Sequence, residues 1–421
     1  MTILMWPRKS SRSALSTDRR ENCPIQSDFS SLEEPLQALS GFFIHLSYSY
    51  TFMKKTDTYL VIFIAVLSSV LWFLPTGFEK QELTINTLHE KGVVISIDDS
   101  ELKRVGLVLT GEQNMEIEIL SGQYKGRKVS ATNFLMGQMS YDKLFREGDK
   151  VLTVLRVDGE NGEIVNARAA EMYRLDVQLI LFALFGLFLV GFARWTGFRA
   201  LLSFVFTALV IWKVLIPLFL RGVPPLPVAY LVVMVTTTVI MLLITGFSRK
   251  GAVALSGALG GVTLTTILTI VFGAWFRVPG TVRDFSEMLL YSGFFSLNLT
   301  GIFLSGIVIS AAGAVMDMAM DIAAAQAEIV EKKPHIGRRE LIFSGFSVGH
   351  AVIGTMTTTL LFAYSGSFTF VLMVFMAQGM PMEYIFNISY VSAEILLTLV
   401  GSFGLVLVAP VTAVLGGLMY K

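Results

Sequence analysis

Residues 299–325 read LTGIFLSGIVISAAGAVMDMAMDIAAA, with only two charged residues, Asp317 and Asp321. A helix needs about 20 predominantly apolar residues to cross a bilayer, and this run is longer than that. Long stretches without charge, separated by places where charges gather, are typical of a chain that lies largely in lipid. The stretch therefore predicts a membrane-spanning helix.

Similar runs recur along the chain. They lie at residues 58–78, 175–193, 198–220, 228–247, 252–275, 341–363 and 393–420. A shorter run at 367–379 is either a tilted span or a re-entrant segment. The composition agrees, since 53% of the 421 residues are hydrophobic and 15% are charged, against about 25% charged in soluble domains. We predict an α-helical polytopic membrane protein with eight or nine spans, the helical domain covering residues 175–421.

The start of the chain differs from the rest. Residues 1–52 are polar and rich in serine, and they include Cys23, the single cysteine. Lys54 and Lys55 then precede an apolar run, as in an uncleaved signal anchor. We predict an anchor over residues 53–78, with residues 1–52 as a disordered tail or a wrongly assigned start before Met53. One cysteine excludes a disulfide framework and a cysteine-based zinc cluster.

Residues 79–174 have a strand-like pattern. Met115-Glu116-Ile117-Glu118-Ile119 alternates with period two, as a half-buried strand does. Three further segments rich in β-branched residues and separated by turn signals are EKGVVISI (90–97), GRKVSAT (126–132) and DKVLTVLRV (149–157). We predict a small β-rich domain, a barrel of the OB or SH3-like type; a small sandwich would give similar patterns.

The basic residues of the short loops predict the orientation. Lys54 with Lys55, Arg194 with Arg199, Arg249 with Lys250, and residues 332–339 all fall on one side when the runs are counted. Because lysine and arginine gather in cytoplasmic loops, we place these loops in the cytoplasm. The β-rich domain then faces outward.

Ionisable residues within a span are candidates for function, because a central Asp costs about 2.5–3.5 kcal/mol to insert. Asp317 and Asp321 are four residues apart and share one helix face, among small residues that allow close helix packing. The pair suits a proton relay or a cation site. Alternatively, Asp321 lies near the cytoplasmic end and meets water. His350 is predicted at a similar depth to Asp317, as a proton-transfer partner or as a packing histidine.

Two weaker signals accompany these residues. Lys213 either reaches toward the membrane interface or serves as a functional counter-ion. Thr355, Thr357 and Thr358 could line a polar path, although threonines in helices more often bond back to the preceding turn.

Enzyme and cofactor motifs are sparse. The sequence has no phosphate-binding loop, no HExxH and no CxxC. Gly345-Phe-Ser347-Val-Gly349 fits the nucleophile-elbow pattern, but that motif needs a strand-to-helix turn and here it opens a predicted membrane helix. We therefore expect no enzyme, no cofactor and no metal site. The net charge of +1 gives no reason to expect a nucleic-acid partner.

The segments GAVMDMAMDIAAAQAEI (313–329) and FSGFSVGHAVIGTMTTTLLFAY (343–364) resemble the YibE/F-like family of multi-pass bacterial membrane proteins. The resemblance extends from about residue 80 to the end and implies location in the bacterial cytoplasmic membrane. Four residues depart from the family pattern. His350-Ala351 stands where Arg-Asp is expected, Thr358 where Asn is expected, and Asp321 where a small residue is usual. Asp321 is thus a candidate to replace the acid lost at Ala351.

These observations favour a secondary transporter or permease of a small solute or ion, coupled to a proton or cation gradient. Asp317 would be the coupling or binding carboxylate. Two alternatives remain open: a membrane scaffold or assembly protein whose outward domain docks a partner protein, and an intramembrane enzyme. Besides the lipid bilayer and a small solute, a homo-oligomer is a possible association.

Overall fold

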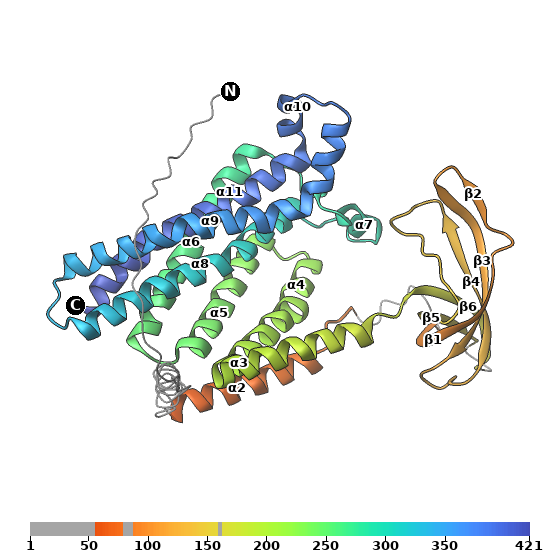
Figure 1. The fold of residues 1–421 in the computed structure, drawn as a ribbon, viewed down its shortest axis with the longest axis horizontal. Helices are drawn as coiled ribbons and strands as arrows, with labels where there is room; N and C mark the ends of the chain where they lie inside the picture. The colour runs from red at the N-terminus through yellow and green to blue at the C-terminus, as the bar shows by residue number, and fades with distance from the viewer. Residues whose placement is uncertain (1–54, 79–86, 159–161) are drawn as a thin grey trace, which may run out of the picture. The chain divides into compact units, whose positions relative to one another are not determined.

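The computed structural model describes residues 55–78, 87–158 and 162–421. The predicted tail, Cys23 and the proposed start at Met53 lie outside the described residues. The described chain contains one β-rich domain and a set of long helices (Figure 1).

Five strands of the β-rich domain form a closed ring. The domain has six described strands, of which all but β2 belong to the ring: β1 (Thr87–Asp98), β2 (Lys103–Val105), β3 (Val108–Ile119), β4 (Lys128–Met136), β5 (Lys150–Val157) and β6 (Ile164–Met172). The order is β1-β5-β6-β4-β3, and β1 also pairs with β3, which closes the barrel; β2 extends β3 at one end. All pairs are antiparallel except β4–β6, which is parallel and joined at Ala131 and Ala167.

The predicted alternation in β3 is confirmed. Met115, Ile117 and Ile119 are buried in the barrel core, while the glutamates between them are not. The other three predicted segments form β1, β4 and β5. Strand β6 was not predicted, because its sequence IVNARAAEM is rich in residues that are uncommon in strands. It is a strand because it pairs along β5 and fills the gap before β4.

A buried amide fixes the long loop between β4 and β5. Gln113, fully buried in β3, donates to Asp99 Oδ1 (2.9 Å) and to the Phe145 carbonyl (3.1 Å). Its own oxygen accepts from the Phe145 N–H (3.1 Å) and from Asn133 Nδ2 (3.2 Å). Since buried polar groups are costly unless paired, these four bonds hold Phe145 in the core.

The helical part begins with one helix before the barrel and continues after it. The elements are α2 (Lys55–Phe73), α3 (Leu175–Val210), the π-helix η1 (Ile211–Leu215), α4 (Ile216–Leu220), α5 (Pro225–Thr245), α6 (Arg249–Phe276), the 3-10 helix η2 (Gly280–Val282), α7 (Ser286–Tyr291), α8 (Leu299–Lys332), α9 (Arg338–Ala377), α10 (Met382–Asn387) and α11 (Ser389–Tyr420). Six described helices are long and apolar enough to cross a membrane. They indicate a membrane-embedded protein; the count of eight or nine spans stays a prediction.

The predicted runs 175–193 and 198–220 both lie in the helical stretch Leu175–Leu220. The helix is broken once, at Arg194, where φ is 48° and ψ is −121°. The segments on either side fold back on each other. Phe182 and Phe204 stack with ring centroids 6.4 Å apart, and a β-carbon at Gly186 would lie 3.3 Å from Leu201. The break at Arg194 therefore turns a long apolar stretch into two antiparallel limbs.

The prediction for residues 367–379 was wrong. Most of this run continues α9, which ends at Ala377, and it is not a separate or re-entrant segment. The physical reason is that no proline separates it from the run before it, and the single Gly366 between the two runs is not enough to end the helix.

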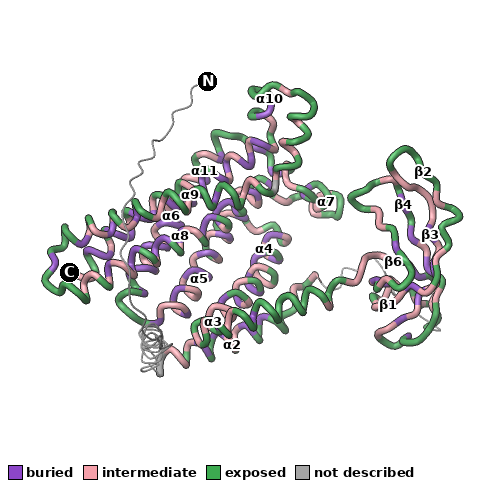
Figure 2. Tube along the Cα trace, in the orientation of Figure 1, coloured by how far each residue is buried: buried purple, intermediate pink, exposed green. Residues whose placement is uncertain are grey.

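The helical core is built from α6, α8 and α11 (Figure 2). Glycines let these helices approach closely: β-carbons at Gly257 and Gly404 would lie 2.2 Å and 2.1 Å from the hydroxyl oxygens of Thr412 and Thr265. Gln326, fully buried, donates to the carbonyls of Leu341 (3.2 Å) and Ala413 (2.9 Å). It thereby joins α8 to α9 and α11.

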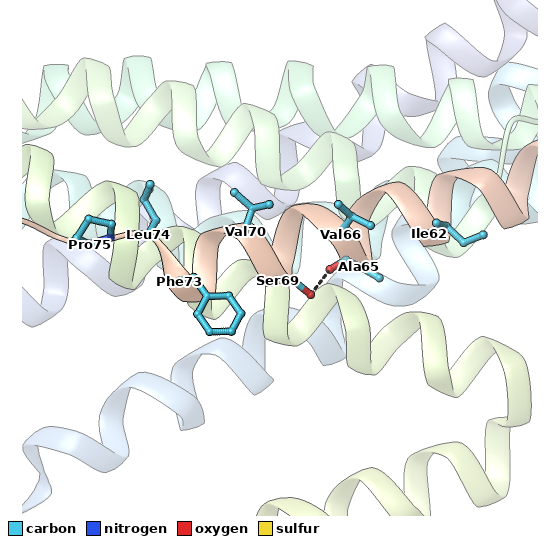
Figure 3. Close-up of a pocket in the computed structure, with 8 residues that line it drawn as sticks. All are labelled: Ile62, Ala65, Val66, Ser69, Val70, Phe73, Leu74 and Pro75. Atoms are coloured by element: carbon cyan, nitrogen blue, oxygen red, sulfur yellow. Dashed lines mark hydrogen bonds between the residues drawn. The ribbon is translucent and has the colours of Figure 1, made fainter.

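A shallow groove runs along α2 between Ile62 and Pro75 (Figure 3). The one polar side chain in its wall is Ser69, whose hydroxyl donates to the Ala65 carbonyl of the same helix (2.9 Å). Because the rest of the wall is apolar, the groove offers few hydrogen-bonding groups to a polar solute.

Candidate functional site

One face of α8 is polar or small and is not covered by other described helices. Exposed residues occur at Gly306, Ser310, Gly313, Asp317 and Asp321, spaced four, three, four and four residues apart. We call this set the α8 stripe. This spacing places all five on one side of the helix. The opposite side, including Val315, Met318 and Ile322, is fully buried in the helical core.

A second exposed face lies on α9. It consists of His350, Ala351, Gly354, Thr355 and Thr358, and we call it the α9 face. Val352, Ile353 and Met356, on the other side of α9, pack against the helical core. A β-carbon at Gly354 would meet no atom within 4 Å, and the same is true of Gly313 on α8. Both faces therefore have open space beside them.

The contacts between α8 and α9 give their antiparallel register. A β-carbon at Gly345 would lie 2.6 Å from Gln326 Nε2, and one at Gly349 would lie 3.6 Å from Ile322. Continuing this register places His350 beside Asp321, and Gly354 beside Asp317. The prediction that Asp317 and His350 share one depth therefore needs correction by about one helical turn. Its physical reason is that α9 begins at Arg338, before the apolar run used to estimate the depth of His350.

The three ionisable residues of these faces make no direct contact with one another. In the part of the chain that the structure describes, no hydrogen bond or ion pair links Asp317, Asp321 or His350 to another residue. They lie near one another along the surface of two packed helices.

The threonine hydroxyls of α9 all turn back on their own helix. Thr355 donates to Val352 O (3.0 Å), Thr357 to Ile353 O (2.7 Å) and Thr358 to Gly354 O (3.0 Å). A hydroxyl whose proton is used in this way still presents lone pairs. Of the three, Thr357 is half-buried and Thr355 and Thr358 are exposed. The α9 face therefore offers hydrogen-bond acceptors.

Lys213 lies away from these two faces. It is in η1, and its Nζ donates to the Leu74 carbonyl at the end of α2 (2.9 Å). Its ammonium thereby satisfies a carbonyl at a helix C-terminus, where positive charge is favourable. The contact does not decide between the two interpretations of Lys213, reaching toward the membrane interface or serving as a counter-ion, and both stay predictions.

Ser347 is exposed on α9, eight residues after Arg339. Gly345 to Gly349 lie within a continuous helix, so they do not form the strand-to-helix turn that the nucleophile motif requires.

An ion pair that the sequence analysis did not identify lies at the other end of the α8 stripe. Arg283, between η2 and α7, donates from Nη1 to Glu394 Oε1 on α11 at 2.5 Å. The Glu394 side chain is 2% exposed, and its Oε2 has no hydrogen-bond partner among the described residues. The signal was present in the sequence, since Glu394 is an acid at the second position of the predicted span 393–420.

A cavity of about 450 Å³ adjoins this ion pair. Its wall includes Arg283 and Asp284, and on α8 it includes Gly306 and Ser310 of the α8 stripe. We call it the α7–α8 cavity. The cavity and the stripe are therefore continuous along one side of α8. Among the described residues, no group of three or more His, Cys, Asp or Glu is placed to hold a metal ion.

Two family profiles match the chain. The profile described as YibE/F-like protein matches residues 181–421, more than half of the chain, and the profile of the YibE/F family N-terminal domain matches residues 107–170. No curated protein and no solved structure matches at a significant level.

Proposed function

The chain belongs to the YibE/F-like family, and we propose that it is a secondary transporter or permease of a small solute or ion, coupled to a proton or cation gradient. In this proposal the α8 stripe and the α9 face line a water-filled path, and Asp317 is the coupling carboxylate.

The observation that carries the proposal is the position of Asp317. It is near the middle of the 34-residue helix α8, on the side that no described helix covers. A central Asp facing hydrocarbon would cost about 2.5–3.5 kcal/mol, and Asp321 lies on the same side. A helix with a fully buried apolar face could have placed small apolar residues here at no such cost. Two carboxylates on the open face are therefore best explained by contact with water and a transported ion.

The chemistry of the two faces supports coupling to a cation or proton. Carboxylates and back-bonded threonine hydroxyls supply acceptors, and the imidazole of His350 has one ring nitrogen that can donate and one that can accept a hydrogen bond. The register places Asp321 beside His350, and hence one position from Ala351. In the family pattern an acid stands where this chain has Ala351. The register therefore fits the hypothesis that Asp321 replaces this acid.

The proposal also covers the type of barrel, the number of membrane spans and their orientation. The ring order β1-β5-β6-β4-β3, with one parallel pair, supports an OB-type barrel. Counting the two limbs on either side of Arg194 and α2 as separate spans gives eight. The basic loops then lie in the cytoplasm, the barrel faces outward, and the protein lies in the bacterial cytoplasmic membrane.

Reconstitution tests this proposal. Wild type, Asp317→Asn and Ser347→Ala are incorporated into vesicles that contain a pH-sensitive dye, and a panel of cationic, anionic and neutral solutes is added outside. We expect at least one solute to change the internal pH with wild type and Ser347→Ala, and none to do so with Asp317→Asn.

Other outcomes would favour the alternatives. Equal flux from wild type and Asp317→Asn would remove Asp317 from the mechanism. Silence of all three proteins, together with capture of a partner protein by the barrel, would favour a scaffold. Chemical conversion of a solute that is lost in Ser347→Ala would favour an intramembrane enzyme.

A further inference from the structure

The α7–α8 cavity is built into the fold by the close approach of Gly280 to α8. The Gly280 N–H donates to Thr300 Oγ1 (3.1 Å), and a β-carbon at position 280 would lie 2.0 Å from the Leu299 carbonyl carbon. Only glycine allows this contact. The segment 280–289 is thereby held over the first turns of α8, and it forms one wall of the cavity.

The charges around the cavity do not balance. Arg283 is neutralised by Glu394, and its guanidinium also lies 5.3 Å from the centroid of the Phe303 ring. Asp284 also lines the cavity and has no ion-pair partner among the described residues. One arginine and two carboxylates leave a net charge of −1 at neutral pH.

The hydrogen-bonding capacity around the cavity is also one-sided. Ser286 donates its hydroxyl to the carbonyls of Arg283 (2.5 Å) and Thr281 (3.1 Å), and Ser310 donates to Ile307 O (3.0 Å). Their protons are therefore used within the protein. What remains is chiefly acceptors. Glu394 is not part of the cavity wall, but it is bonded to Arg283, which is, and its buried Oε2 has no donor among the described residues.

An unpaired carboxylate oxygen this deeply buried needs an explanation. A buried ion pair generally adds little stability over an apolar pair, because desolvation offsets its attraction. Leaving the second oxygen of Glu394 without a donor adds to this cost. A ligand with N–H donors and a positive charge would supply the missing hydrogen-bond donor, and its attraction to the carboxylate would offset the desolvation cost.

We propose that the α7–α8 cavity is a binding site for a small organic cation that carries a primary ammonium group. In this proposal the ammonium donates to the Asp284 carboxylate in the cavity wall and reaches Glu394 Oε2 past the side chain of Arg283, which separates Glu394 from the cavity. The hydrocarbon part lies against Leu289, Ile302 and Ile307, which also line the cavity. The inference rests on the proposed function, for which it names the substrate class: the cavity adjoins the α8 stripe, so a bound cation is positioned to enter the path toward Asp317.

Thermal stability of the purified full-length protein in detergent tests this site. The probes are butylamine and putrescine as cations, with butyrate as a matched anion. Because a ligand that binds only the folded state raises its stability, we expect both amines to raise the melting temperature and butyrate to leave it unchanged. Glu394→Gln should weaken the apparent affinity for the amines at least about tenfold. Glu383→Gln, an exposed acid on α10, is the control and should bind them as wild type does.

Asp284→Asn is the second variant, because it lies on the segment before α7 and should fold even if Glu394→Gln does not. It too should weaken amine binding. The proposal is overturned if butyrate stabilises the protein and the amines do not, if no probe stabilises it, or if Glu394→Gln and Asp284→Asn both bind the amines as Glu383→Gln does.

The test separates this site from the transport proposal. Asp317→Asn should keep amine binding and lose proton flux. Amine binding in a protein without any coupled flux would leave the site standing and refute transport. Flux of an anionic or neutral solute without amine binding would refute the site and leave transport standing.

Discussion

Replacing Gly404 with alanine tests how tightly α6 and α11 pack. A β-carbon there would lie 2.1 Å from Thr265 Oγ1 and 3.1 Å from both Cβ and Cγ2 of the same residue. Thr265 is buried, and its hydroxyl is held by a bond to Gly261 O (2.8 Å), so it cannot turn aside without losing that bond. The two helices must therefore move apart.

The size of the effect follows from two opposing terms. Overpacking a well-packed core costs about 1–3 kcal/mol. Alanine recovers up to about 1 kcal/mol through its higher helix propensity. We expect a net loss of about 1–2 kcal/mol in the free energy of unfolding. Gly366→Ala on α9 is the matched control, because a β-carbon there would meet no atom within 4 Å.

The assay is unfolding of the purified protein in mixed micelles, with the double variant Gly404→Ala, Thr265→Ala included. We expect the double variant to be more stable than the sum of the two single changes predicts, because the clash is removed. If Gly404→Ala is as stable as Gly366→Ala, and the two changes are additive, the close packing of α6 and α11 is refuted.

Three further predictions concern the barrel and the register of α8 and α9. Gln113→Ala removes four buried hydrogen bonds and should destabilise the barrel by about 2–4 kcal/mol, seen as faster hydrogen exchange in the intact protein; unchanged exchange would contradict it. The backbone N–H of Met136, with smaller contributions from neighbouring N–H groups, holds the pKa of Asp142 below its ordinary value. Ionised Asp142 therefore stabilises the fold at pH values above the ordinary pKa. This contribution is lost as the pH falls through the lower pKa of the folded state. Asp142→Asn should flatten this part of the acid dependence, measured as melting temperature against pH, and an unchanged curve would contradict it. In a protein with Cys23 replaced by serine, the pair Asp321→Cys, His350→Cys should cross-link faster than Asp317→Cys, His350→Cys, and the reverse order would refute the register.

The helical architecture follows closely from the sequence because apolar length has few alternative explanations. The runs 299–325 and 252–275 became the cores of α8 and α6. Helix ends were less predictable. Composition shows which residues can lie in lipid, but it does not show where a helix begins or ends. Helix α9 begins at Arg338, before the predicted run 341–363, and continues after it to Ala377, because backbone hydrogen bonding does not stop where hydrophobicity falls.

The barrel shows where local pattern fails. Strand β3 alternates between buried and exposed residues, and its period could be read directly. Strand β6 has a sequence without strand preference, and it is fixed by pairing with β5, a contact that no local pattern encodes. The tertiary context overrides the propensity of Ala167 and Ala169.

The candidate site was predictable in its residue types and less so in its geometry. Asp317 and Asp321 were identifiable because acids are rare within spans. The pairing of Asp321 with the level of His350 depends on the register of α8 and α9, which contacts at Gly345 and Gly349 determine. The partnership of Arg283 and Glu394 joins residues 111 positions apart, and only the fold brings them together.

The most direct test of the central claim is the water accessibility of α8 in the membrane. Single cysteines are placed in the protein without Cys23 and exposed to a membrane-impermeant thiol reagent in sealed vesicles. We predict labelling at Gly306, Ser310, Gly313 and Asp317, and protection at Ala311, Val315 and Ala319, which are buried on the opposite side. Protection of the α8 stripe throughout its length, or labelling without this helical period, would contradict a water-filled path along α8.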